Sequence, residues 1–208
     1  MDADPYLPIP HSDDAGNTIL HVGPRMVTVG EFARFVKKRA YMTLLETEFE
    51  DWVSWRNSDW TGGVISLEEA AGEWSQASVV YLTRQDAEAY FEWLGEGRLP
   101  TIAELATALV EAQATGVHFE AATGYELVND HAGPWGACVY SNAIPTCLKL
   151  VREGATASDL RKLRVNSVQD SHILPDRTIS REGLTAILTG TLKNQEADSQ
   201  PAGFRIVR

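Results

Sequence analysis

A threonine followed three residues later by an acidic side chain recurs along this chain, each time ahead of apolar residues at helical spacing. In such a capping box the threonine oxygen accepts from the backbone N–H of the third residue, whose carboxylate accepts from the threonine's own N–H. The pairs are Thr28 with Glu31, Thr83 with Asp86, Thr101 with Glu104 and, in a weaker copy, Ser66 with Glu69. The sequence therefore predicts capped amphipathic helices over its first half.

Short apolar runs predict strands at residues 18–22, 79–82, 184–192 and 204–208. After about residue 115 the helical spacing fades, and only a brief helix at 159–165 is predicted. Residues 1–17, rich in Pro and Asp, predict an irregular N-terminal arm, followed by one domain over 18–208. The fold class expected from this order is α+β, with helices early and loops and strands late.

The charge of the chain limits the classes of partner. A net charge of −11 argues against a nucleic-acid-binding surface, because phosphate contacts require clustered Lys and Arg. The basic runs at 37–39 and 161–164 are short and typical of solvated helix faces. No apolar run reaches the roughly 20 residues that span a bilayer, and the N-terminus has no apolar signal core. We therefore expect a soluble cytoplasmic protein without nucleic-acid or membrane partners.

Five segments carry a family resemblance: VTVGEFARFV at 27–36, VVYLTRQDAEAY at 79–90, WLG with RLPTIAEL within 93–105, YELVND at 125–130 and GFRIVR at 203–208. In this order they resemble VTNxEFxxFV, PVxxVSWxDAxAY, WxGKRLPTEAEWE, VWEWVxD and GFRxVR of the formylglycine-generating enzyme (sulfatase-modifying factor) family. The resemblance covers residues from about 19 to 208. It implies a C-type-lectin-like fold with few regular elements and long loops.

The family's catalytic strings have no counterpart here. Active members carry RGGSW and, downstream, two cysteines separated by four residues that hold copper. Here residues 151–155 are the nearest trace of RGGSW, and Cys138 and Cys147 are separated by eight residues and lie too early. The HxxxHxE-type iron signature of the related sulfoxide synthases is missing too. We therefore expect a non-catalytic module, a pseudoenzyme, that binds a protein or peptide partner and needs no cofactor.

An alternative is a diverged copper- or iron-dependent oxidase or oxygenase acting on a cysteine or other thiol. Cys138, Cys147 and His131 would then be its catalytic or metal-binding residues, because thiolates bind soft metals and can form a redox pair. The competing interpretation is that each cysteine is a small buried hydrophobic residue.

Two clusters are candidate binding sites. The first could form a groove wall for a peptide, since Trp and Arg are enriched at binding hot spots, or could pack beneath a long loop. It consists of Trp52, Trp55, Arg56 and Trp60. The second could hold structural calcium through its oxygens, or its Asn and Asp could bond to local backbone in a turn. It consists of Asn129, Asp130, His131 and Trp135.

Overall fold

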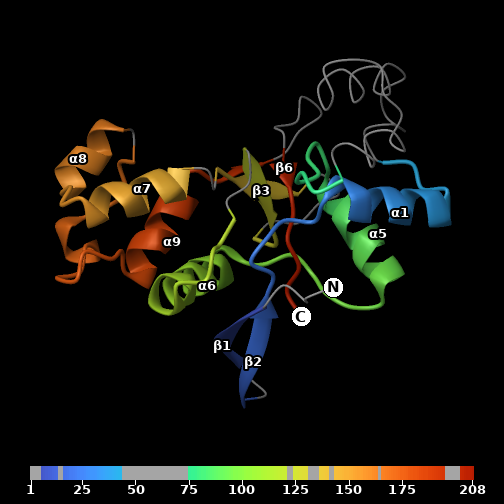
Figure 1. Ribbon diagram of the computed structural model, residues 1–208, viewed down its shortest axis with the longest axis horizontal. Helices are drawn as coiled ribbons and strands as arrows, with labels where there is room; N and C mark the ends of the chain where they lie inside the picture. Colours follow the sequence, from blue (N-terminus) through green and yellow to red (C-terminus); the bar gives the residue numbers. More distant parts are fainter. Residues whose placement is uncertain are drawn as a thin grey trace.

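The computed structural model describes residues 6–13, 16–43, 75–120, 124–130, 136–140, 143–163, 165–194 and 202–208. At their centre is a four-stranded sheet with the strand order β5-β4-β3-β6. Its strands are β3 (Tyr125–Val128), β4 (Ala137–Val139), β5 (Lys193–Asn194) and β6 (Ala202–Gly203). β4 is antiparallel to both β3 and β5, whereas β6 runs parallel to β3. Helices flank this small sheet on two sides (Figure 1), so the fold class is α+β as expected.

The three strongly predicted helices are confirmed. They are α1 (Val29–Arg39), α5 (Arg84–Leu94) and α6 (Ile102–Thr115), and the capping box is formed at each of them. Gly95 and Gly116 follow the last residues of α5 and α6 in the left-handed conformation that favours glycine at a helix end. Each threonine cap contributes about 1 kcal/mol to helix stability. The weaker copy at Ser66 lies outside the described residues.

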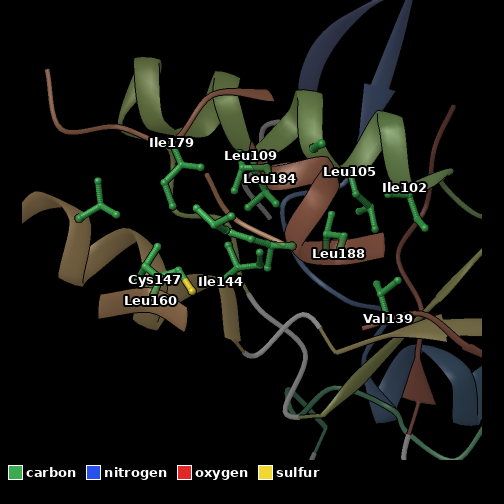
Figure 2. Packing of buried hydrophobic residues seen from close by; sticks show 14 of the residues in the cluster. Ile102, Leu105, Leu109, Val139, Ile144, Cys147, Leu160, Ile179, Leu184 and Leu188 are labelled. Atoms are coloured by element: carbon green, nitrogen blue, oxygen red, sulfur yellow. The ribbon is translucent and has the colours of Figure 1, made fainter. Parts of the chain in front are cut away.

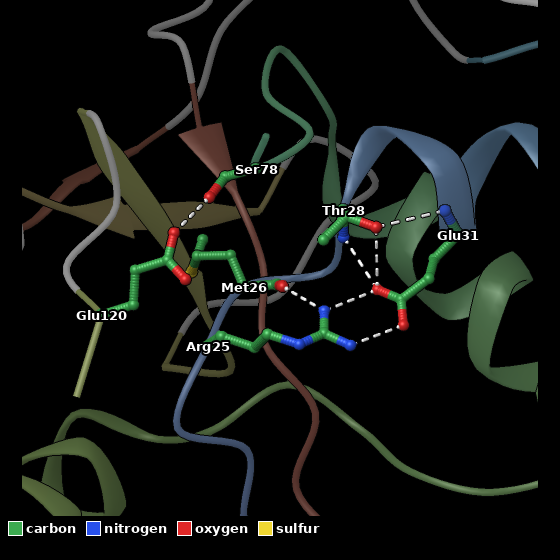
Figure 3. Close-up of polar contacts among 6 residues, drawn as sticks. All are labelled: Arg25, Met26, Thr28, Glu31, Ser78 and Glu120. Carbon is green, nitrogen blue, oxygen red and sulfur yellow. Dashed lines mark hydrogen bonds and ion pairs between the residues drawn. The ribbon is translucent and has the colours of Figure 1, made fainter. Parts of the chain in front are cut away.

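An arginine three residues before the capping threonine reinforces two of these helix starts. Arg25 donates from both terminal nitrogens to the Glu31 carboxylate at 2.8 Å (Figure 3). Arg98 does the same to Glu104 at 2.8 and 2.5 Å. Each Nη1 also donates to the carbonyl oxygen of the following residue, at 3.1 and 3.0 Å. Burial opposes ionisation of both glutamates, but the hydrogen bonds from arginine and threonine outweigh it, so the pKa of Glu31 and of Glu104 is lowered. The chain entering each helix is thus fixed to its first turn.

The irregular arm predicted for residues 1–17 is wrong over the described part of that range. β1 (Leu7–Asp13) pairs with β2 (Gly16–Val22) in an antiparallel hairpin over the whole length of both strands. Leu7 and Ile9 are buried in a cluster with the α6 residues Ala108 and Ala112, while Pro8 and Pro10 point to the exposed side. Residues 7–10 alternate between buried and exposed, as in a strand, but the prolines at the exposed positions suggested an irregular segment. Proline is tolerated here because both strands of a two-stranded hairpin are edge strands. The strand predicted at 18–22 is confirmed within β2.

The second half is more helical than predicted. It contains α7 (Ala143–Arg152), α8 (Ala157–Lys162), the short 3-10 helix η1 (Asp170–His172) and α9 (Arg181–Thr189). The strand predicted at 184–192 is wrong, because Leu184, Ile187 and Leu188 follow helical spacing and all face the core from α9. The brief helix predicted at 159–165 is α8, which begins earlier because Thr156 caps it.

The sheet separates two hydrophobic cores. On one face, Leu127 and Cys138 lie opposite each other and join an aromatic cluster with α1 and α5. On the other face, Val128, Ala137 and Val139 pack into a cluster built by α6, α7, α8 and α9 (Figure 2). Successive residues of a strand point to opposite faces, so neighbours along β4 belong to different cores.

The closing segment is extended but forms a regular strand only at β6. Beyond it the backbone bonds go to different partners: Val27 N–H donates to the Phe204 carbonyl at 2.8 Å, while Val207 pairs in both directions with Arg98 at 3.0 Å. The predicted strand at 204–208 is therefore a series of bridges that hold the chain end between two other segments.

The strand predicted at 79–82 is also irregular. Val79 N–H donates to the Val27 carbonyl at 2.9 Å and Leu82 N–H to the Ala202 carbonyl at 3.0 Å, and both side chains are buried as expected. Tyr81 has a φ of 62°, outside the extended region, and this breaks the strand.

We predict that Gly203→Ala destabilises the protein by about 1–3 kcal/mol, because the added Cβ would collide with the Val79 carbonyl oxygen. Gly95→Ala is the control: it meets nothing within 4 Å and costs only the strain of its left-handed backbone, about 1 kcal/mol. Urea denaturation of both variants measures the difference. Equal stability of Gly203→Ala and the parent would contradict the packing described for β6.

Candidate functional site

A cavity of about 790 Å³ lies between α6, α7 and the segment that follows α6. This volume falls in the range of roughly 300–1,000 Å³ typical of ligand pockets. Its walls are mostly apolar, with α6 contributing Leu109 and Ala112 and α7 contributing Ile144 and Leu148. Phe119, from the segment after α6, completes the apolar lining.

The sequence of α7 explains how the cavity forms. Ile144, Cys147 and Val151 recur at the spacing of one helix face and are buried in the core shared with α6 and α9. Leu148, beside that face, is only partly buried and borders the cavity. Pro145 lies in the first turn of α7, where its missing N–H has no intrahelical partner to lose. One edge of the apolar face of α7 is therefore buried in the core, and the other edge, at Leu148, lines the cavity.

A buried ion pair forms the base of the cavity. Arg205 and Glu126 have side chains that are 0% and 1% exposed, and their two contacts join Nε to Oε1 and, at 2.9 Å, Nη2 to Oε2. Arg205 also donates to the carbonyl oxygens of Gly23 at 3.1 Å and Glu120 at 2.8 Å. Its guanidinium lies 3.9 Å from the ring centroid of Phe119. Arg205 therefore fixes the position of the Phe119 ring in the cavity wall, and the charges of Arg205 and Glu126 neutralise each other inside the protein.

The rim of the cavity is charged. Lys149, Arg152 and Glu153 of α7 and the adjoining turn are exposed, and so is His118 on the opposite side. Lys149 and Glu153 approach only to 4.0 Å. Glu120, also at the cavity, accepts a hydrogen bond from the Ser78 hydroxyl at 3.0 Å (Figure 3). The site thus combines an apolar interior with polar groups at its edge.

Asn129 and Asp130 lie at the end of β3, outside this cavity. The Asn129 N–H donates to the Pro100 carbonyl at 2.8 Å, and Asp130 Oδ2 accepts from the Ile102 N–H at 2.7 Å at the start of α6. Burial raises the pKa of Asp130, the bond from Ile102 opposes this, and the nearby Glu104 charge adds to the rise. The Asp130 carboxylate therefore bonds to backbone that is distant in sequence and not to the local backbone of a turn, and the Asn129 bond comes from its main chain. The calcium site stays a prediction.

Cys138 and Cys147 are both free and buried, on opposite sides of the sheet. Cys138 belongs to the aromatic core of α1 and α5, and Cys147 to the core of α6–α9 (Figure 2). Burial raises the pKa of Cys138 to about 12 and that of Cys147 to about 11. Because the sheet lies between the two side chains, they do not fit a shared copper site. Within the described ranges, no three His, Cys, Asp or Glu residues are grouped as metal ligands.

The remaining predicted site residues lie outside the described residues. They are Trp52, Trp55, Arg56, Trp60, His131 and Trp135. Of the predicted binding residues that the structure describes, Asn129 and Asp130 do not line the cavity. The cavity was not predicted because no helix was predicted at residues 143–152. The spacing of Ile144, Cys147, Leu148 and Val151 does indicate a helix with one apolar face.

Comparison with known proteins gives one family. The model of the sulfatase-modifying factor enzyme 1-like domain matches residues 20–146, which is more than half of the chain. The matched region runs from β2 into the first turn of α7. No curated protein matches the chain. Within the part of the chain that the structure describes, each helix is too short or too polar to cross a bilayer.

We predict that neither native thiol reacts with a disulfide reagent at mildly alkaline pH, because both are buried and their pKa values of about 12 and 11 leave almost no thiolate. Thr146→Cys places a thiol on the exposed side of α7 and serves as the reactive control. Absorbance of the released reagent measures the rate, and both native thiols should react after denaturation. Native rates equal to that of the control would contradict the assignment.

We predict that Glu126→Gln destabilises the protein by about 3–5 kcal/mol, because it leaves the buried Arg205 charge without its counter-ion. The double variant Glu126→Leu with Arg205→Met should be more stable than Glu126→Gln, since it leaves no buried charge. Denaturant midpoints of the two variants test this. A double variant that is no more stable than Glu126→Gln would contradict the role assigned to the buried charge.

Proposed function

This chain belongs to the sulfatase-modifying factor enzyme 1-like family, and on that premise we propose that it is a non-catalytic binding module that recognises a protein or peptide partner. The observation that supports the proposal is the helical structure of the stretch in which the family's reactive strings are expected. The family resemblance implies an RGGSW segment, whose nearest trace here is at residues 151–155, and downstream of it a cysteine pair. Here α7, α8 and α9 occupy that stretch and form a core of their own.

The scaffold that supports this role is of the C-type-lectin-like type. The small central sheet, the long connection between β4 and β6, and the contact of the Arg208 guanidinium with the Tyr6 ring, 4.3 Å from its centroid, are consistent with it. Backbone bonds between His21 and Arg208 at 2.9 Å in both directions close the domain near its ends. A domain closed this way tolerates a changed insertion between β4 and β6, because function resides in sites grafted on a fold.

The cavity between α6 and α7 is the binding site in this proposal. Its apolar walls suit a large apolar side chain of the partner, the kind of anchor that dominates the free energy of protein recognition. Peptide backbone would stay at the rim, since the Gln113 side chain, a polar group lining the cavity, is engaged on both of its atoms. It donates to the Ile179 carbonyl and accepts from the Ile179 N–H, both at 3.3 Å. Unpaired peptide groups are costly to bury, so the interior favours a side chain over backbone.

We predict that a random peptide display library selected on the full chain enriches sequences with Leu, Ile or Phe, and that Leu148→Arg reduces the enrichment about tenfold or more. Leu148→Arg introduces a charge and bulk at the wall of the cavity. Leu163→Arg is the matched control, because Leu163 is 51% exposed and does not line the cavity. Thermal unfolding of both variants first establishes that they are folded.

Sequencing of the selected pools reads out the experiment. Enrichment that survives Leu148→Arg, or that is lost equally in Leu163→Arg, would refute the cavity as the binding site. A pool with no enriched sequences on the parent chain would refute the binding function itself.

A further inference from the structure

From the charges at its rim, we infer that the cavity selects an acidic partner segment, in which Asp or Glu flanks the apolar anchor. This inference rests on the proposed binding function and specifies its ligand. The apolar side chain of the partner would contact the apolar wall of the cavity, and the acidic side chains of the partner would contact the cations at the end of α7.

The acidic groups of the cavity are already engaged. Glu126 is neutralised by Arg205, and the Glu120 carboxylate accepts from Ser78. Glu153 is the remaining acid at the rim, exposed and 4.0 Å from Lys149, a distance and exposure at which a pair contributes little. Among the described residues that line the cavity, Glu153 is therefore the acid at the end of α7, whereas Glu120, which keeps its charge, belongs to the segment after α6.

The cations at the rim are available to a ligand. Lys149 and Arg152 are three residues apart on α7, a spacing that puts both side chains on one side of the helix. The Lys149 side chain is 75% exposed. Among the described residues the Arg152 guanidinium has no carboxylate within ion-pair distance, so its charge is uncompensated there.

A third cation extends this basic edge. Arg177 donates from Nη1 to the Arg152 carbonyl oxygen at 3.4 Å, which brings its guanidinium to the end of α7. Asp176, its neighbour in sequence, directs its carboxylate to the Thr178 hydroxyl at 2.6 Å. Lys149, Arg152 and Arg177 outnumber the two carboxylates beside them, Glu153 and Asp176, so this edge carries an excess of positive charge in a chain with a net charge of −11. Such complementarity favours acidic partners and disfavours basic ones.

Three fluorescein-labelled nonapeptides test the inference on the full chain by fluorescence anisotropy. They share a central Leu-Phe-Leu and carry flanks of Asp and Glu, of Ser and Gln, or of Lys and Arg. We expect the acidic peptide to bind roughly fivefold more tightly than the neutral one, the size expected for two exposed ion pairs, and the basic peptide to bind most weakly. In about 1 M salt, where the Debye length falls to about 3 Å, the preference should disappear.

The variant Lys149→Gln with Arg152→Gln should lose the acidic preference and keep its affinity for the neutral peptide. The matched control is Arg34→Gln with Lys37→Gln on α1, which removes an Arg and a Lys at the same spacing from another exposed helix face and should leave the preference unchanged. Equal binding of the three peptides, or a preference retained in the α7 variant, overturns the inference alone. If none of the peptides binds, the proposed function and the inference both fail.

Discussion

The ion pair between Glu126 and Arg205 is the contact on which the rest of the structure depends. It joins β3 to the closing segment across 79 positions of sequence, and Arg205 also holds the carbonyl oxygens of Gly23 and Glu120. Removing two charges from water is costly, and the cost is offset only when every donor and acceptor is satisfied. The pair therefore ties β3, the closing segment, Gly23 and the segment after α6 to one another.

The sheet that this pair completes also determines what chemistry the chain can perform. Because neighbouring residues of β4 face different cores, Cys138 is separated from Cys147 by the sheet itself. Each thiol is surrounded by apolar side chains and serves as a core residue. The capped helices α1, α5 and α6 and the strands β3 and β4 lie within the region that the family model matches, and the two cysteines share no site there.

The helices α7, α8 and α9 lie almost entirely beyond the region that the family model matches, and the cavity lies between α7 and α6. α9 packs along α6, and α7 is held beside them by Ile144, Cys147 and Val151. The remaining apolar edge, at Leu148, faces α6 across a space that the Phe119 wall closes from the side. The cavity has an apolar interior and a charged edge because the amphipathic helix α7 lies beside α6 and the space between them is not filled by side chains.

The helix starts at Thr28, Thr83 and Thr101 were predictable because a capping box joins residues only three apart, so its partners are visible in the sequence itself. The family resemblance was likewise recognised from the order of short local motifs along the sequence. Whether residues 7–13 form a strand, whether 184–192 are helix, and where a cavity lies were decided by tertiary structure alone. Strand pairing and burial depend on partners distant in sequence, and an apolar run becomes helix or strand according to the surface it must cover.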